Sequence, residues 1–128
     1  MGAGIESLAN VTVDCGFHVH RDIGPGLLES AYELLLAESL IRRGLSVERQ
    51  VPVSLKANGI VIDNAFRADL LVERSLLVEV KSTETHAPVH AKQLLTYLRL
   101  MDLPLGLLMN FGAATFKEGV RRIVNNHV

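Results

Sequence analysis

The chain has 128 residues, of which 48% are hydrophobic and 21% charged. This length and composition predict one folded domain spanning residues 1–128 and exclude an intrinsically disordered chain. The formal net charge is −1. Because the chain has no general positive charge, binding to nucleic acid would need a local basic patch or a bound metal ion.

The sequence lacks the signals of export and membrane insertion. Cys15 is the only cysteine, which excludes an intrachain disulfide. The first twenty residues include Glu6 and Asp14 and lack the apolar segment of a signal peptide. No apolar run approaches the roughly 18 residues that a membrane-spanning helix needs. We therefore expect a cytoplasmic protein that does not contact membranes.

The first half of the chain predicts a helix, a strand and a tight turn after an ambiguous segment. Residues 11–19 fit a strand by alternation, and residues 5–19 fit a helix by apolar spacing, so the pattern leaves both open. Leu27–Arg43 predicts a helix that ends at Gly44. Val47–Leu55 predicts a strand, and Asn58-Gly59 is typical of a hairpin turn. The expected apolar stripe of the helix consists of Leu27, Leu28, Ala31, Leu34, Leu35 and Ile41.

A second hairpin is predicted near the middle of the chain. Phe66–Val72 and Leu76–Ser82 flank the polar triplet Glu73-Arg74-Ser75, which predicts antiparallel strands joined by a three-residue loop. Side chains alternate between the two faces of a strand. One face of the hairpin is then wholly apolar and is expected to belong to the core: Phe66, Ala68, Leu70, Val72, Leu76, Val78 and Val80.

The opposite face of this hairpin gathers charged residues. The register places Asp69 opposite Glu79 and Arg67 opposite Lys81, so both cross-strand pairs carry like charges. Such pairs destabilise an ordinary sheet, whereas a cation between the two carboxylates would stabilise the acidic pair. Carboxylates suit Mg²⁺ or Mn²⁺, and a neighbouring lysine suits metal-assisted hydrolysis of a phosphodiester. The pattern alone also fits a solvated sheet face that has no function.

The last third of the chain predicts a helix, a strand and a second helix. Ala87–Met101 is expected to be helical, with Pro88 in its first turn. Leu105–Phe111 is nearly all apolar, which is typical of a strand buried on both faces. Phe116, Val120, Ile123 and Val124 recur at helical spacing and predict a final helix. The order of elements indicates an α/β (α+β) sandwich.

One motif carries a resemblance to a known family. Residues 26–32 match Gly-x-x-Glu-x-x-Tyr, and on this motif the chain resembles the GxxExxY family, a compact branch of the PD-(D/E)xK nuclease superfamily. The resemblance implies a restriction-endonuclease-like αβββαβ core, with a mixed central sheet flanked by helices. It also implies that the first twenty residues are helical. It covers almost the whole chain, through Val19-His20-Arg21, Glu48–Pro52, Phe66–Glu73 and Leu107–Gly112.

The resemblance implies roles for single residues. Asp69 matches the metal-binding aspartate, while Ala68 stands where the superfamily's name has proline. Glu29 resembles the acidic residue that completes the metal shell, and Glu33, one turn on, competes with it. Gln93-x-x-x-Tyr97 resembles an element of RecB-like exonuclease domains in which both side chains face the site. The implied metal ligands are Asp69, Glu79 and Glu29, and the implied catalytic residues are Asp69, Glu79, Lys81, Gln93 and Glu29.

Other residues keep two interpretations. Tyr32 fits a site residue and a core residue, and Gln93 also fits an exposed helix surface. The histidines at 20, 86 and 90 show no recognised ligand spacing for a transition metal. The basic residues fit solvated surfaces better than a phosphate-binding patch. They are Arg42, Arg43, Lys117, Arg121 and Arg122.

Two functions from different classes follow. The first is a Mg²⁺- or Mn²⁺-dependent nuclease that hydrolyses phosphodiester bonds of DNA or RNA by a PD-(D/E)xK mechanism. The second is a non-catalytic interaction protein or complex subunit that retains the nuclease fold. A nuclease this small, without a separate nucleic-acid-binding domain, is expected to need a homodimer or a partner subunit to hold its substrate.

Overall fold

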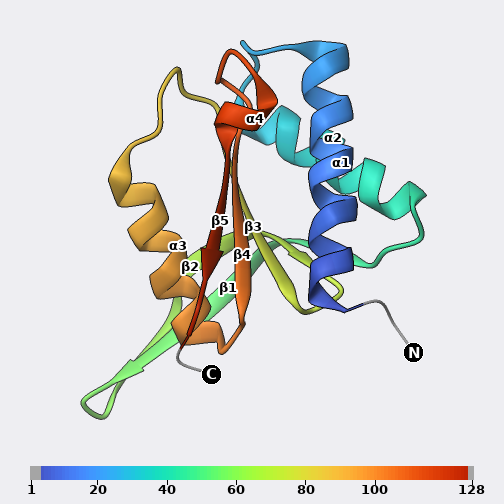
Figure 1. Cartoon of the computed structure of the whole chain (residues 1–128). Coiled ribbons are helices and arrows are strands. Elements are labelled where there is room, and N and C mark those ends of the chain that lie inside the picture. Colours follow the sequence, from blue (N-terminus) through green and yellow to red (C-terminus); the bar gives the residue numbers. More distant parts are fainter. Residues whose placement is uncertain (1–3, 127–128) are drawn as a thin grey trace.

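The chain folds into a mixed five-stranded sheet with helices on both faces (Figure 1). The computed structural model describes residues 4–126. Its elements are α1 (Ile5–Ile23), α2 (Glu29–Arg42), β1 (Val47–Ala57), β2 (Ile60–Val72), β3 (Leu76–Lys81), α3 (Pro88–Met101), β4 (Leu105–Asn110), α4 (Phe116–Gly119) and β5 (Val120–Val124).

The sheet order confirms the predicted core. Strands run in the order β1-β2-β3-β4-β5, and β3 and β4 are parallel whereas the other neighbours are antiparallel. The run α2-β1-β2-β3-α3-β4 is the expected αβββαβ arrangement. Among the described helices, none is both long and apolar enough to cross a membrane.

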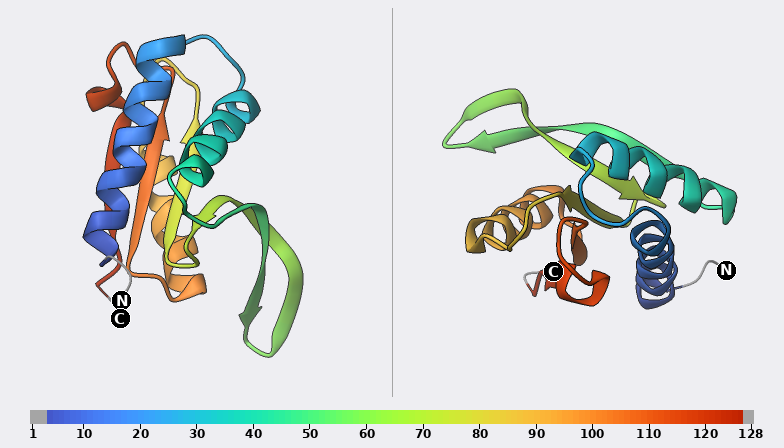
Figure 2. Two further views of the ribbon diagram at one scale, coloured as in Figure 1. Left: turned by 90° about the vertical axis from the view of Figure 1, so that its right-hand side faces the viewer. Right: turned by 90° about the horizontal axis from the view of Figure 1, so that it is seen from above.

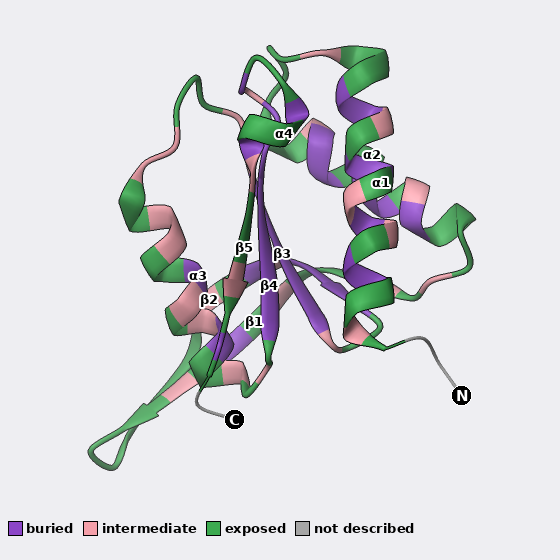
Figure 3. Cartoon of the chain, viewed as in Figure 1, coloured by how far each residue is buried: buried purple, intermediate pink, exposed green. Residues whose placement is uncertain are grey.

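Two apolar clusters hold the layers together. The larger joins α1 and α2 to one face of the sheet, and the smaller joins α3 to the other face (Figure 2). The parallel strands β3 and β4 lie between them and are buried along almost their whole length (Figure 3). Strands covered on both faces are apolar throughout, which explains the continuous hydrophobic run from Leu105.

The helical prediction for the first twenty residues is confirmed by α1 from Ile5 onward, and its part on residues 1–3 lies outside the described residues. The predicted stripe of the next helix is wrong. The side chains of Leu28 and Ile41 are 78% and 48% exposed. Leucines occupy most sides of α2, so their spacing did not identify the buried side. Tyr32 marks the buried side of α2, because its ring stacks on Phe111 with 4.7 Å between ring centroids. The buried side consists of Tyr32, Glu33, Leu36, Ala37 and Leu40.

The turns were predicted correctly. Gly44 has a left-handed φ of 84°, and the N–H of Leu45 donates to the Leu40 carbonyl, which closes the end of α2. Asn58 and Gly59 have φ values of 52° and 76°, as a tight hairpin turn requires. This first hairpin extends beyond the body of the molecule, and its tip is exposed (Figures 2 and 3).

The second hairpin confirms part of the predicted register. Leu70, Leu71 and Val72 pair with Val78, Leu77 and Leu76. The predicted Arg67–Lys81 pair is wrong, because the ladder between β2 and β3 ends at Leu70–Val78 and does not reach Arg67. The single apolar face is also wrong. Leu70 and Val72 pack in the cluster with α1 and α2, whereas Ala68 packs in the cluster with α3.

The predicted final helix is wrong as well. Only Phe116–Gly119 is helical, and Val120–Val124 forms β5 along the free edge of β4. The β-branched residues Val120, Ile123 and Val124 favour a strand once a partner strand is available. Gly119 lies so close to β4 that an added Cβ would stand 2.1 Å from the Asn110 carbonyl oxygen.

We predict that Gly112→Ala destabilises the protein and loosens the end of β3. A Cβ at Gly112 would lie 2.4 Å from the Thr83 carbonyl oxygen, so backbone must move. The expected loss in free energy of unfolding is about 1–3 kcal/mol, as for overpacked sites. Urea unfolding measures it. Ala114→Ser, at an exposed neighbour, should change that free energy by less than about 0.5 kcal/mol; equal effects would contradict the packing argument.

Candidate active site

The site forms where the side chains of β1 and of β2 both pass from one face of the sheet to the other. Arg49 pairs with Leu70 on the α1 and α2 side of the sheet, whereas Val51 pairs with Ala68 on the α3 side. Strict alternation would keep residues 49 and 51 on one face. The change occurs at residue 50 and, directly across the hairpin, at Asp69. Sequence patterning assumed unbroken alternation and therefore missed it.

Pairing between β2 and β3 also ends at this level, and two carboxylates take its place. The last ladder pair before the strands part is Leu70–Val78. Beyond it, the Asp69 N–H donates to Glu79 Oε2 at 2.7 Å, and the Val80 N–H donates to Asp69 Oδ2 at 2.8 Å. Each carboxylate thus has one oxygen fixed by a backbone N–H, and Asp69 Oδ1 and Glu79 Oε1 stay outside these bonds.

Glu79 carries a strongly shifted pKa. Its side chain is buried, with 6% of its surface exposed. Burial, and next the charge of Asp69, raise the pKa of Glu79 from its ordinary value of 4.5 to about 8. The Asp69 N–H and the charge of Lys81 act in the opposite direction but do not outweigh burial. The ionised form of Glu79 therefore needs a positive charge nearby.

Lys81 and helix α3 form the other side of the site. Alternation along β3 places Lys81 on the same face as Glu79, and its charge acts on both Glu79 and His90. Burial, followed by the charges of Glu79 and Asp69, raises the pKa of Tyr97. The Tyr97 ring also stacks on Phe66 with 3.8 Å between centroids. Tyr97 thus lies next to the acidic pair.

Two acids of α2 approach the site differently. Glu33 is buried, and its charge acts on Glu79. Both of its oxygens are bonded, Oε2 to Arg49 and Oε1 to Gln50. Glu29 is exposed, and its charge acts on His90. The structure therefore brings Glu33 nearer to Glu79, while the ligand role of Glu29 stays a prediction.

Other predicted positions take structural or surface roles. Tyr32 belongs to the core, where its hydroxyl accepts from the Leu27 N–H and donates to the Gly24 carbonyl. Gln93 is exposed on α3, and Cys15 is buried. The side chains of His20, on α1, and of His86, just before α3, bond to the backbone carbonyls of Ala113 and Glu118.

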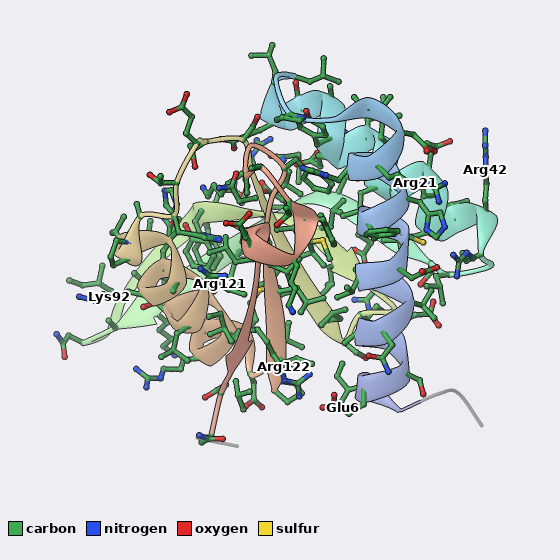
Figure 4. The ribbon with its side chains drawn as sticks, turned by 45° about the horizontal axis from the view of Figure 1, so that its top comes forward. Glu6, Arg21, Arg42, Lys92, Arg121 and Arg122 are labelled. Atoms are coloured by element: carbon green, nitrogen blue, oxygen red, sulfur yellow. The ribbon has the colours of Figure 1, made fainter. Side chains whose placement is uncertain are left out.

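The basic residues are spread over several elements. Arg21 and Arg42 lie with α1 and α2, while Lys92 and Arg121 lie with α3 and β5 (Figure 4). Arg122 points toward Glu6 and forms an ion pair with it (Figure 4). This scatter agrees with solvated faces rather than one dense phosphate-binding patch.

Sequence patterning missed Arg49 and Gln50, although both contact Glu33. Gln50 Nε2 donates to Glu33 Oε1 at 2.6 Å and lies 3.4 Å from Asp69 Oδ1. The only sequence signal was indirect, since both residues fall within the Glu48–Pro52 segment that carries the family resemblance.

Comparison of the chain with known proteins assigns it to a family. A family model described as PD-(D/E)XK nuclease superfamily matches residues 6–123. The chain belongs to the PD-(D/E)XK nuclease superfamily. It is also similar to a solved structure titled "Crystal structure of SSO0001", with 16% sequence identity and a TM-score of 0.44. That match covers 92% of this chain and 78% of the other. No curated protein matches the chain.

PD-(D/E)XK nucleases generally use divalent metal ions, and the donor groups here fit one. Asp69 and Glu79 are hard oxygen donors, and no lysine, arginine or histidine nitrogen of the described chain forms a salt bridge with either. Within residues 4–126, no three acidic, histidine or cysteine side chains gather closely enough to hold a metal alone. Mg²⁺ suits such a site, because it keeps several waters and needs only one or two carboxylates.

We predict that Glu79→Gln stabilises the metal-free protein increasingly as pH rises. The folded-state pKa of Glu79 lies above its ordinary value of 4.5, so its contribution to stability is lost as pH rises from about 5 through about 8. Glutamine carries no charge and can still accept from the Asp69 N–H. The expected gain is roughly 4 kcal/mol at pH 8 and about 1 kcal/mol at pH 5.

Urea unfolding in a chelating buffer at pH 5, 6.5 and 8 measures this gain. Glu84→Gln is the matched control, because Glu84 is exposed and its substitution should give no pH-dependent difference. A gain for Glu79→Gln that stays constant over this range would show that ionisation of Glu79 is not its cause.

Proposed function

We propose that the chain is a metal-dependent nuclease that hydrolyses phosphodiester bonds of DNA or RNA. The acidic pair supports this proposal most strongly, because Asp69 and Glu79 fix each other through backbone N–H groups and each keeps one further oxygen. Burying Glu79 beside the half-buried carboxylate of Asp69 is unfavourable without a positive charge. A Mg²⁺ or Mn²⁺ ion at this point would supply that charge.

Each residue has a role in this proposal. Asp69 and Glu79 hold the metal, and Glu29, which lies outside this pair on α2, is proposed as the further acid because both oxygens of Glu33 are already bonded. When bound, the divalent cation acidifies an attacking water and neutralises charge that develops on the phosphate. Lys81 orients that water or stabilises the negative transition state. Gln93 and Tyr97 lie one turn apart on α3, where the charges of Glu79 and Asp69 act on Tyr97, and Gln93 is proposed as a further catalytic residue.

The finer family assignment is also a proposal. Within the superfamily, we place the chain in the GxxExxY family, on the match of residues 26–32 and the further motifs along the chain. We also propose that residues 1–128 form one nuclease-like domain that acts in the cytoplasm on nucleic acid. A homodimer or a second subunit would help the domain to hold this substrate.

We predict that Mn²⁺ binds the wild-type protein and that Asp69→Asn removes this binding. Asparagine can keep the hydrogen bond from the Val80 N–H, so the fold should survive, but it loses the charge. The affinity should fall by more than the roughly 10–100-fold that loss of a metal's outer-shell partner costs. Calorimetric titration of Mn²⁺ and Mg²⁺, without nucleic acid, measures both proteins.

Asp63→Asn is the matched control, because Asp63 is an exposed aspartate on the same strand. It should bind Mn²⁺ as the wild type does. If the folded wild-type protein binds neither metal, or if Asp69→Asn binds as tightly as the wild type, this metal site does not exist as proposed.

We predict that Lys81→Met lowers the rate of cleavage and leaves Mn²⁺ binding intact. Removing one group that stabilises the transition state should reduce the rate about 100-fold or more. The assay screens single- and double-stranded DNA and RNA with Mn²⁺, first with the wild type and then with the variant. Lys56→Met, at an exposed lysine on β1, is the control. Equal rates for Lys81→Met and the wild type would contradict the role of Lys81.

An exposed apolar surface favours a second function. Ile60, Val61 and Ile62, at the tip of the first hairpin, are 64%, 57% and 49% exposed. Such a surface fits a partner protein. If the protein binds metal but cleaves none of the four substrates, a non-catalytic interaction protein that retains the nuclease fold becomes the better assignment.

A further inference from the structure

Gln50 has an unfavourable backbone conformation in the middle of a strand. Its φ is 53°, in the left-handed region that favours glycine, although it carries a full side chain. Adjacent residues of a regular strand point to opposite faces. Here the left-handed turn at Gln50 breaks the alternation, so that Gln50 and its neighbour Arg49 reach the same carboxylate.

That carboxylate belongs to Glu33 of α2. One of its oxygens accepts from Arg49 and the other accepts from Gln50. Arg49 donates to Oε2 from Nε at 3.2 Å and from Nη2 at 3.0 Å. Gln50 Nε2 donates to Oε1 at 2.6 Å. Glu33 is only 5% exposed, and a buried carboxylate persists when it is paired and hydrogen-bonded. Glu33 is therefore a fixed anchor.

The same amide group of Gln50 also faces the acidic pair. Its Nε2 lies 3.4 Å from Asp69 Oδ1, the oxygen that the Val80 N–H leaves free. Gln50 stands directly across the hairpin from Asp69, between the pairs Arg49–Leu70 and Val51–Ala68. One amide thus joins a fixed anchor on α2 to the oxygen of Asp69 that is available to a metal.

We infer that Gln50 is a positioning residue of the metal site. Its amide, held by Glu33, sets the orientation of Asp69, and its unfavourable backbone is retained because only this conformation brings the amide there. This inference rests on the proposed metal site. Residues kept in unfavourable conformations cluster at functional sites, and the partners of metal ligands set ligand geometry.

The variant Gln50→Gly separates positioning from folding. Glycine adopts the left-handed conformation without strain, and it removes the amide. We expect the affinity for Mn²⁺ to fall about tenfold or more, while the melting temperature of the metal-free protein stays equal or rises. A side chain that served the fold alone would show the reverse, a lower melting temperature with unchanged affinity.

Asn64→Gly is the matched control. Asn64 also has a φ of 53°, but it is exposed on the projecting part of β2. The same relief of strain there should leave the affinity for Mn²⁺ unchanged. Glu33→Met, which removes both acceptor oxygens, tests the anchor: if Gln50 acts through Glu33, adding Gln50→Gly to Glu33→Met should lower the affinity by much less than tenfold.

The outcomes separate this inference from the proposed function. If Asp69→Asn removes Mn²⁺ binding while Gln50→Gly binds within twofold of the wild type, the metal site stands and the positioning role is wrong. If Gln50→Gly loses affinity only together with a lower melting temperature, its role is structural and the inference is again wrong. If the folded wild type binds no Mn²⁺, the proposed function fails and the positioning role fails with it.

Discussion

Where β2 and β3 part, the backbone N–H groups of Asp69 and Val80 donate to carboxylates instead of strand carbonyls. A buried N–H without an acceptor costs about 1–3 kcal/mol, so a sheet cannot simply end its pairing at this depth. Here the Glu79 carboxylate accepts the N–H of Asp69, and the Asp69 carboxylate accepts the N–H of Val80. The exchange fixes the separation of the strands and brings the buried Glu79 together with the half-buried Asp69.

The unfavourable features of the fold gather around this exchange. Glu79 is buried close to a second carboxylate, and Gln50, directly across from Asp69, has a left-handed backbone. Neither feature is required by the rest of the sheet, whose β3 and β4 pair regularly over six residues. Local conflicts of this kind mark functional places in proteins that are otherwise self-consistent.

Much of the fold could be predicted from the sequence, because short-range rules determine it. The loop at Glu73-Arg74-Ser75 set the register of the strands beside it, and Asn58-Gly59 set the first hairpin. The helix predicted over Val120–Val124 is wrong because of long-range pairing. This segment becomes a strand only because it pairs with the free edge of β4. The leucines of α2 looked equivalent in sequence, and the contact of Tyr32 with Phe111 distinguishes its sides.

The candidate site could be predicted only in part. The spacing of Asp69, Glu79 and Lys81 along two strands brought the acids together, and the structure shows why they meet. Nothing in local propensity indicates that a glutamine at position 50 adopts a left-handed φ, so the change of face and the contacts of Arg49 with Glu33 stayed hidden. Those contacts join two separate elements, β1 and α2, which no pattern within one element can report.

The mutual bonding of Asp69 and Glu79 constrains how this site can change during evolution. Each acid accepts a backbone N–H of the strand opposite, so an apolar replacement would leave that group without an acceptor. Relatives that lack the proposed chemistry should therefore carry asparagine and glutamine at these two positions. A relative with both amides would lack the proposed reaction and keep the architecture.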